Sequence, residues 1–198
     1  MNYLAHIYLS GDQPTTQIGG LLGDFIKGPL DAQLHAPFYP GLLLHRRIDA
    51  HLDALEEFRD LLSSFEPQHR RFAGILLDIL FDHFLASEWP DDANQPLEEF
   101  CESFYRELNK HYQALPKSAQ HFANRAPAIQ WLQNYRDFEN LHPMLQRVSQ
   151  RFSRQVALQD AIPHLQHNYD FYRSGYRSIF PQISVFAEKE LRNILKNI

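Results

Sequence analysis

Apolar residues recur along the chain every three or four positions, which is the period of an amphipathic α-helix. Alternating runs of β-branched residues are missing, and Leu, Ala, Gln, Glu and Arg dominate. The pattern predicts an all-α fold, a single compact helical domain spanning residues 1–198. We expect helices at residues 2–10, 16–25, 42–63, 67–87, 96–115, 127–139, 141–155 and 158–195, the last split near Ser174–Gly175 or Pro181.

The helix predicted at residues 67–87 contains charged groups that its apolar pattern does not explain. Apolar side chains cover almost its whole circumference, so it should be buried, yet it carries Asp78, Asp82 and His83. An unpaired buried carboxylate is costly or takes up a proton. We therefore expect these acids to have a partner, which is either a metal ion or an arginine such as Arg46, Arg47 or Arg71.

A second pair of polar residues lies on the preceding predicted helix, in "HRRIDAHLD". His45 and Asp49 are four residues apart and share one helix face, as Asp78 and Asp82 do on the next helix. A tight turn joins the two helices, which should pack antiparallel, so the two pairs can face each other. Histidine and carboxylate together suit Mn²⁺, Fe²⁺, Mg²⁺ or Zn²⁺.

Two further candidates come from the first 25 residues. His6 lies in "NYLAHIYL" and Asp24 in "GGLLGDFIKG". His6 is either a metal ligand or a hydrogen-bonded histidine of the core. The glycines before Asp24 are poor helix formers, so Gly19, Gly20 and Gly23 indicate close packing, against either a neighbouring helix or a ligand.

Three basic residues accompany these candidates. Arg46 and Arg47 follow His45, and Lys27 follows Asp24. Beside a metal, such groups would bind phosphate oxygens and stabilise the charge that develops in phosphoryl transfer. The alternative is a solvated positive patch. No GK[ST] phosphate loop, GxSxG or HExxH motif is present.

Composition limits the partners. The chain is 44% hydrophobic and 22% charged, and its formal net charge of −5 gives no support to a nucleic-acid partner. A single cysteine, Cys101, fits a reducing compartment. We expect no secretory signal and no membrane span, because the apolar runs are too short. The expected location is the cytoplasm, and the sequence leaves the oligomeric state open.

Several motifs together resemble those of a known family. "MNYLAHIYLS", "GGLLGDFIKG", "HRRID" and "LLDILFDHFL" resemble, in order and spacing, the acyl carrier protein phosphodiesterases. The resemblance implies hydrolysis of the phosphodiester that joins 4′-phosphopantetheine to a serine of holo-acyl carrier protein. It also implies a divergent HD-like helical bundle and a divalent metal, Mn²⁺ before Mg²⁺ or Fe²⁺.

The HD signature itself is absent, because this chain has the reversed dipeptide Asp82-His83. Ligands are therefore assigned from position in the predicted helices. The candidate metal ligands are His6, Asp24, His45, Asp49, Asp78, Asp82 and His83. The candidate catalytic residues are Asp24, Lys27, His45, Arg46, Arg47 and Asp82.

The metal would activate a water for attack on phosphorus, and a histidine such as His51 would protonate the leaving serine. Because carrier proteins are acidic, we expect a basic docking patch at Arg46, Arg47, Arg70 and Arg71. Two alternatives remain. The first is a metal phosphohydrolase that acts on nucleotides or another small phosphodiester. The second is a non-catalytic helical binding protein whose buried acids pair with arginines.

Overall fold

Helices account for the regular structure of this protein, as the sequence pattern predicts. The computed structural model describes residues 1–91, 93–150, 152 and 156–198, and within them it has eleven α-helices, short 3₁₀ turns and no β-strand. The helices are α1 (Tyr3–Leu9), α2 (Pro14–Leu22), α3 (Tyr39–Ala54), α4 (Glu56–Ser63), α5 (Pro67–Arg70), α6 (Ala73–Ser87), α7 (Leu97–Lys110), α8 (Lys117–Arg125), α9 (Leu141–Ser149), α10 (Ile162–His167) and α11 (Tyr169–Lys196). None of the helices in these residues is long and apolar enough to cross a bilayer.

The first three helices approach one another closely because glycines line their contacts. Helix α2 packs against both α1 and α3. A Cβ added to Gly19 would come within 2.8 Å of the Gly41 Cα on α3, and one added to Gly20 within 2.7 Å of the His6 carbonyl oxygen on α1. Close packing against a neighbouring helix is thus the role of both glycines. As a result, α1 and α3 both pack closely against α2.

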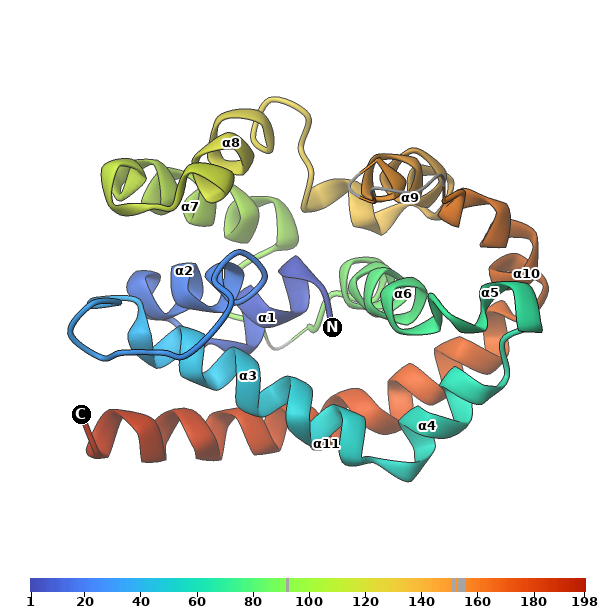
Figure 1. Cartoon of the computed structure of the whole chain (residues 1–198), viewed down its shortest axis with the longest axis horizontal. Helices are drawn as coiled ribbons and strands as arrows, with labels where there is room; N and C mark the ends of the chain where they lie inside the picture. Colours follow the sequence, from blue (N-terminus) through green and yellow to red (C-terminus); the bar gives the residue numbers. More distant parts are fainter. Residues whose placement is uncertain (92, 151, 153–155) are drawn as a thin grey trace.

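Helix α6 lies beside α1 near the middle of the molecule, and most of its side chains are buried (Figure 1). The long helix α11 runs along α3 and α4, while α7 covers α2 and α9 packs on α6. Leu77, Leu80 and Leu85 of α6 are fully buried, as its nearly all-round apolar pattern predicts. The polar residues of α6 must therefore find their partners inside the protein.

Two predicted helices of the N-terminal half are each divided in the structure. The helix expected at residues 42–63 breaks at Leu55, whose backbone is extended (ψ 132°), and α4 then packs along α11. The helix expected at residues 67–87 is interrupted at a turn, where the Phe72 amide donates to the His69 carbonyl. At both breaks the chain changes direction. Packing against neighbouring helices determines this change, and the apolar periodicity does not reveal it.

The C-terminal half departs further from prediction. Residues 127–139, expected to be helical, form turns and short 3₁₀ segments, because the backbone at Gln130 has a positive φ of 47°. Helix α8 lies instead at Lys117–Arg125, a helix that the sequence pattern did not predict. Helix α11 is continuous through Pro181, and the break expected inside it falls before it, at Asn168. The expected end of the 141–155 helix lies outside the described residues.

Candidate metal centre

One group of metal-binding side chains forms where α1 meets α3. Asp49 lies one turn after His45 on α3, and its two oxygens are 3.0 Å from His6 Nε2 and 3.2 Å from His45 Nε2. The two imidazole rings stack with their centroids 3.7 Å apart. One ligating atom from each of the three residues lies within 4.8 Å of the others. We call His6, His45 and Asp49 the candidate metal centre.

The backbone of α2 fixes the orientation of His45. Its Nδ1 lies 2.8 Å from the Gly20 carbonyl oxygen and must donate a proton to it, since a carbonyl can only accept. The ring also presses on Gly23, where an added Cβ would lie 2.2 Å from the His45 Cγ. Gly23 is thus a glycine because the imidazole occupies the space of a side chain. The Nε2 atom is left facing Asp49.

This geometry calls for a positive charge between His45 and Asp49. If Nδ1 holds the only proton of a neutral ring, Nε2 carries a lone pair and faces a carboxylate oxygen at 3.2 Å. Two electron-rich atoms at that distance repel unless a proton or a metal ion joins them. A histidine held through one nitrogen by a carbonyl, with the other nitrogen free to ligate, is the usual arrangement around metals.

The charge states of the centre also suit a metal. Burial, together with neighbouring His45, lowers the pKa of His6 to about 3, so its ring is neutral at pH 7. Burial would raise the pKa of Asp49, but its close contacts with His45 and His6 outweigh burial and hold that pKa well below its usual range. Neutral imidazole and ionised carboxylate are the forms in which these groups bind metals.

Two further carboxylates lie at the rim of the centre. Asp78 of α6 is 2.9 Å from the Met1 ammonium, which is also 3.7 Å from Asp49. Burial raises the pKa of Asp24, and its Oδ2 has no hydrogen-bond partner among the described residues. Both rim carboxylates add negative charge beside the centre when they are ionised, and the Met1 ammonium offsets part of that charge.

The rim opens into a cleft. Asp24 and Asp78 face a cavity of about 250 Å³, and its other described lining residues are Asn2, Tyr3, Ile75, Ile79, Val148 and Phe152. The Asp49 and Asp78 side chains are 42% and 35% exposed, so solvent or a substrate can reach them, whereas His6 is fully enclosed. The arrangement is a partly buried group of candidate ligands beside a cleft with both polar and apolar walls, which fits a divalent metal with an open coordination position.

Comparison with known proteins gives the family of the chain. The model of the family described as acyl carrier protein phosphodiesterase matches residues 1–183. The chain belongs to this family. A Klebsiella pneumoniae protein named acyl carrier protein phosphodiesterase is 32% identical over 194 residues, which cover 96% of this chain and 99% of the relative. A Serratia proteamaculans protein of the same name is 28% identical over 184 residues, 92% of this chain and 95% of the relative. No solved structure matches the chain.

In this acyl carrier protein phosphodiesterase family member, the polar residues of α6 serve three separate purposes. Only Asp78 reaches the rim. Both oxygens of Asp82 accept backbone hydrogen bonds, from Leu4 at 2.8 Å and Ala5 at 3.0 Å, at the start of α1. Burial raises the pKa of Asp82 to about 8 despite these two bonds. The structure therefore places Asp82 under α1, not among the ligating atoms.

His83 also lies apart from the centre. Its Nδ1 is 2.7 Å from the Tyr135 carbonyl oxygen and its Nε2 is 2.8 Å from the Tyr169 hydroxyl, so both ring nitrogens are occupied. This family member thus satisfies two of the three buried polar groups of α6 without a cation. The predicted pairing of Asp78 and Asp82 with arginines does not form among the described residues.

The basic candidates do not gather at the centre either. Arg47 points to α11 and pairs with Glu190, and Arg46 donates to the Ile26 carbonyl at 3.3 Å. Lys27 is exposed on the loop after α2. His51, the expected proton donor, stacks on Phe186 at 3.9 Å where α3 meets α11. Arg46 is the nearest of them in sequence to a residue of the candidate metal centre, His45, and it is half-buried.

Sequence reasoning missed the groups that support the ligands. The Gly20 carbonyl and the space left by Gly23 position His45, and α9 supplies part of the cleft wall. The glycine-rich stretch before Asp24 was the available signal for the first two. A backbone carbonyl has no residue type, so no motif could reveal its role.

Proposed function

We propose that this protein hydrolyses the phosphodiester between 4′-phosphopantetheine and the serine of holo-acyl carrier protein, releasing the apo carrier and 4′-phosphopantetheine. Membership in the family supports the reaction class and the protein substrate. The observation that carries the proposal is the His6–His45–Asp49 group at the edge of an open cleft.

We further propose that His6, His45 and Asp49 hold a divalent metal, Mn²⁺ before Mg²⁺ or Fe²⁺. When bound, such an ion lowers the pKa of water and offsets charge on phosphate oxygens. Imidazole and carboxylate ligands suit these metals better than Ca²⁺, which prefers a larger cage of oxygen atoms. Asp78 at the rim adds negative charge that favours the cation.

The chain itself contributes positioning and proton transfer. The Gly20 carbonyl holds the His45 ring in one tautomer, so its Nε2 is presented in a fixed direction. Asp24 faces the cleft with a free oxygen, and burial raises its pKa, which makes it the best-placed acid to protonate the departing serine oxygen. Ile75 and Ile79 give the cleft an apolar wall that a substrate can contact.

Intact-mass analysis of the carrier tests the reaction. After incubation with Mn²⁺ and this protein, holo-acyl carrier protein should return to its apo mass, with an unmodified serine. A carrier that keeps a phosphoserine would put the broken bond on the other side of phosphorus. An unchanged carrier mass with every divalent metal, together with turnover of a small phosphodiester, would favour the small-molecule alternative. The Asp49→Asn variant, purified in the same way, controls for contaminating activity.

A further inference from the structure

A second cavity lies beside the cleft and is lined by basic side chains. It measures about 530 Å³ and is formed mainly by α8, α9 and the segment between them. We call it the basic cavity. Its described lining residues include His121, Arg125 and Arg147 and no carboxylate. In a chain with a net charge of −5, this local excess of positive charge is unusual.

The basic cavity and the cleft share a wall. Phe25, which follows Asp24 in the chain, lines the basic cavity, while Tyr3 lines the cleft. The two rings stack with centroids 5.9 Å apart, and Phe25 also contacts Phe122 of α8 at 6.1 Å. A molecule resting on the basic cavity therefore lies directly beside the mouth of the cleft.

The basic groups of this surface are available to a partner. Arg125 and Arg147 are exposed, and within the described part of the chain neither has a carboxylate partner. The Arg147 guanidinium lies 5.6 Å from the centroid of Trp131, which holds it at the cavity. Lys117, His121 and Arg125 are spaced four residues apart on α8, so they form one stripe along the helix.

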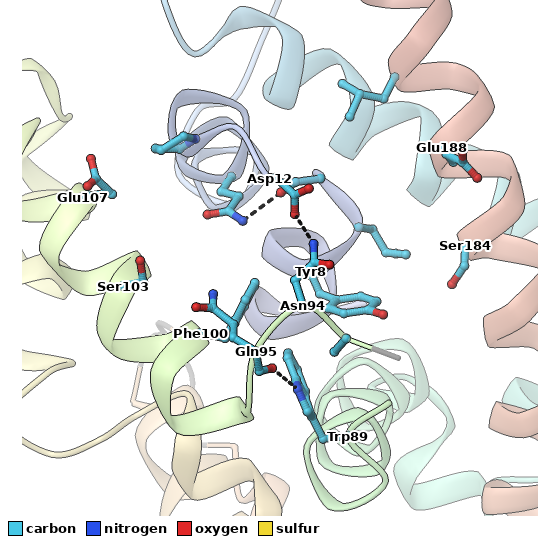
Figure 2. A pocket seen from close by; sticks show the side chains of 16 residues that line it. Tyr8, Asp12, Trp89, Asn94, Gln95, Phe100, Ser103, Glu107, Ser184 and Glu188 are labelled. Carbon is cyan, nitrogen blue, oxygen red and sulfur yellow. Dashed lines mark hydrogen bonds between the residues drawn. The ribbon is translucent and has the colours of Figure 1, made fainter. Parts of the chain in front are cut away.

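The opposite charge surrounds another cavity of the molecule, of about 650 Å³. Asp12, Glu107 and Glu188 line it, and no lysine or arginine is among its described lining residues (Figure 2). Tyr8 lines this acidic cavity, whereas His6, two residues earlier on α1, belongs to the metal centre. An acidic macromolecule is thus repelled from one side of α1 and attracted to the side that carries the cleft.

Three of the four arginines in the patch expected from the sequence make contacts within the chain. Arg47 is paired with Glu190, and Arg46 bonds to the Ile26 carbonyl. Arg70 donates to the carbonyls of Ser63 and Phe65 on the segment before α5. Of these three, only Arg47 has a carboxylate partner among the described residues. Arg71 is exposed, with its guanidinium 5.7 Å from the Phe72 ring centroid, and it lines a cavity that a carboxylate, Asp160, also lines.

We propose that the α8–α9 surface around the basic cavity docks the acidic face of the carrier protein, with the carrier's serine turned toward the cleft. This inference rests on the proposed function for the identity of the partner. Lys117, His121, Arg125 and Arg147 form the docking surface. The rim charges of such a surface govern encounter more than chemistry.

Charge reversal tests the docking surface. The double variant Arg125→Glu/Arg147→Glu should raise the KM for holo carrier by about tenfold or more at low salt, with kcat changed less than about twofold. The control is Arg192→Glu, which reverses a 65% exposed arginine of α11. The C-terminal end of this helix lies across the molecule from α8 and α9 (Figure 1). The Arg192→Glu control should have a KM within about twofold of the wild type. Added salt should reduce the difference in KM between this control and the double variant.

Direct binding separates this inference from the proposed function. Binding of labelled holo carrier to the Asp49→Asn protein, which should not turn it over, should weaken by a similar factor when both arginines are reversed. If Arg125→Glu/Arg147→Glu and Arg192→Glu raise KM by the same factor, the proposed docking surface is wrong. So does loss of turnover of a small phosphodiester in the α8–α9 variant, since the arginines would then belong to the reacting site. A wild-type protein that binds the carrier but never cleaves it overturns the proposed function alone.

Discussion

Helices α3 and α6 each carry a pair of polar residues four positions apart, and the structure uses the two pairs differently. On α3, His45 and Asp49 point the same way and meet His6 at one point. On α6, Asp78 turns to the rim of that site, whereas Asp82 binds the backbone of α1. A spacing of four residues therefore places two side chains on the same helix face, but it does not determine whether they share a binding partner.

The difference lies in what each pair meets. The α3 pair meets His6, whose two ring nitrogens have no backbone hydrogen-bond partner among the described residues. A cation can therefore bind between His6 and the α3 pair. Asp82 meets the first free amides of a helix, which are ready-made donors to a carboxylate. By holding the start of α1, Asp82 fixes where His6 lies, and so it supports the centre without touching a metal.

The largest expected contrast between the pairs is in turnover. Asp49→Asn removes a charged ligand, so kcat/KM for the carrier should fall by more than about 100-fold, the upper range for loss of outer-sphere support alone. Asp82→Asn keeps an acceptor for α1 and should stay within about fivefold of the wild type at 25 °C, because the geometry of His6 is largely retained. Initial rates at saturating Mn²⁺ measure both. The reverse order of the two variants would move the centre to α6.

A second contrast is between Gly23, which lies against the His45 ring, and Gly74, which has open space beside it. Gly23→Ala should push the His45 ring from its place and weaken Mn²⁺ binding about 10- to 100-fold. Gly74→Ala in α6 is the matched control, because no atom lies within 4 Å of its added Cβ, and it should leave Mn²⁺ affinity unchanged. Mn²⁺ titration of both variants gives the comparison. Equal affinities would show that the ring can move aside.

The third contrast is in stability. Asp82→Ala leaves two buried amides without an acceptor and should lower the free energy of unfolding by roughly 2–4 kcal/mol. Asp82→Asn should recover part of that loss, because its amide oxygen still accepts. Urea unfolding in the presence of a chelator measures the effect without any contribution from metal. An alanine variant of wild-type stability that fails to bind metal would restore Asp82 as a ligand.

The smallest expected effect is on the pH dependence of stability. The pKa of Asp82 is raised from 3.8 to about 8, so between these values the folded protein holds a proton that the unfolded chain has released. Stability should therefore fall as the pH rises through this window, by at most about 1.4 kcal/mol per unit from this group. Between pH 7.5 and 8.5, where His6 is neutral in the folded protein and almost entirely neutral in the unfolded chain, Asp82→Asn should flatten the slope of the urea midpoint against pH. Parallel slopes would mean that Asp82 is ionised throughout.

The sequence was sufficient for those features that depend on periodicity. It predicted the all-α fold, the burial of α6, the shared face of His45 and Asp49, and the close packing at Gly19 and Gly20. It also brought His6 forward as a candidate, although only the meeting of α1 with α3 reveals which side chains it contacts.

The rest depended on contacts between distant segments. A helical pattern shows which face of α6 carries Asp82, but not that the start of α1 lies against it. Similarly, nothing in the pattern at residues 127–139 shows that Gln130 adopts a positive φ and ends the helix. Three residues of the proposed docking surface lie on α8, which the sequence pattern did not predict as a helix.

Mn²⁺ binding to three proteins tests the central claim most directly. Electron paramagnetic resonance of free Mn²⁺ during titration gives the affinity of the wild type, Asp49→Asn and Asp82→Asn at pH 7. If α3 and α1 hold the metal, the wild type and Asp82→Asn bind with similar affinity, and Asp49→Asn loses binding by at least about 100-fold, in line with loss of a ligand. Retained binding in Asp49→Asn together with lost binding in Asp82→Asn, or no binding in the wild type, would contradict the account.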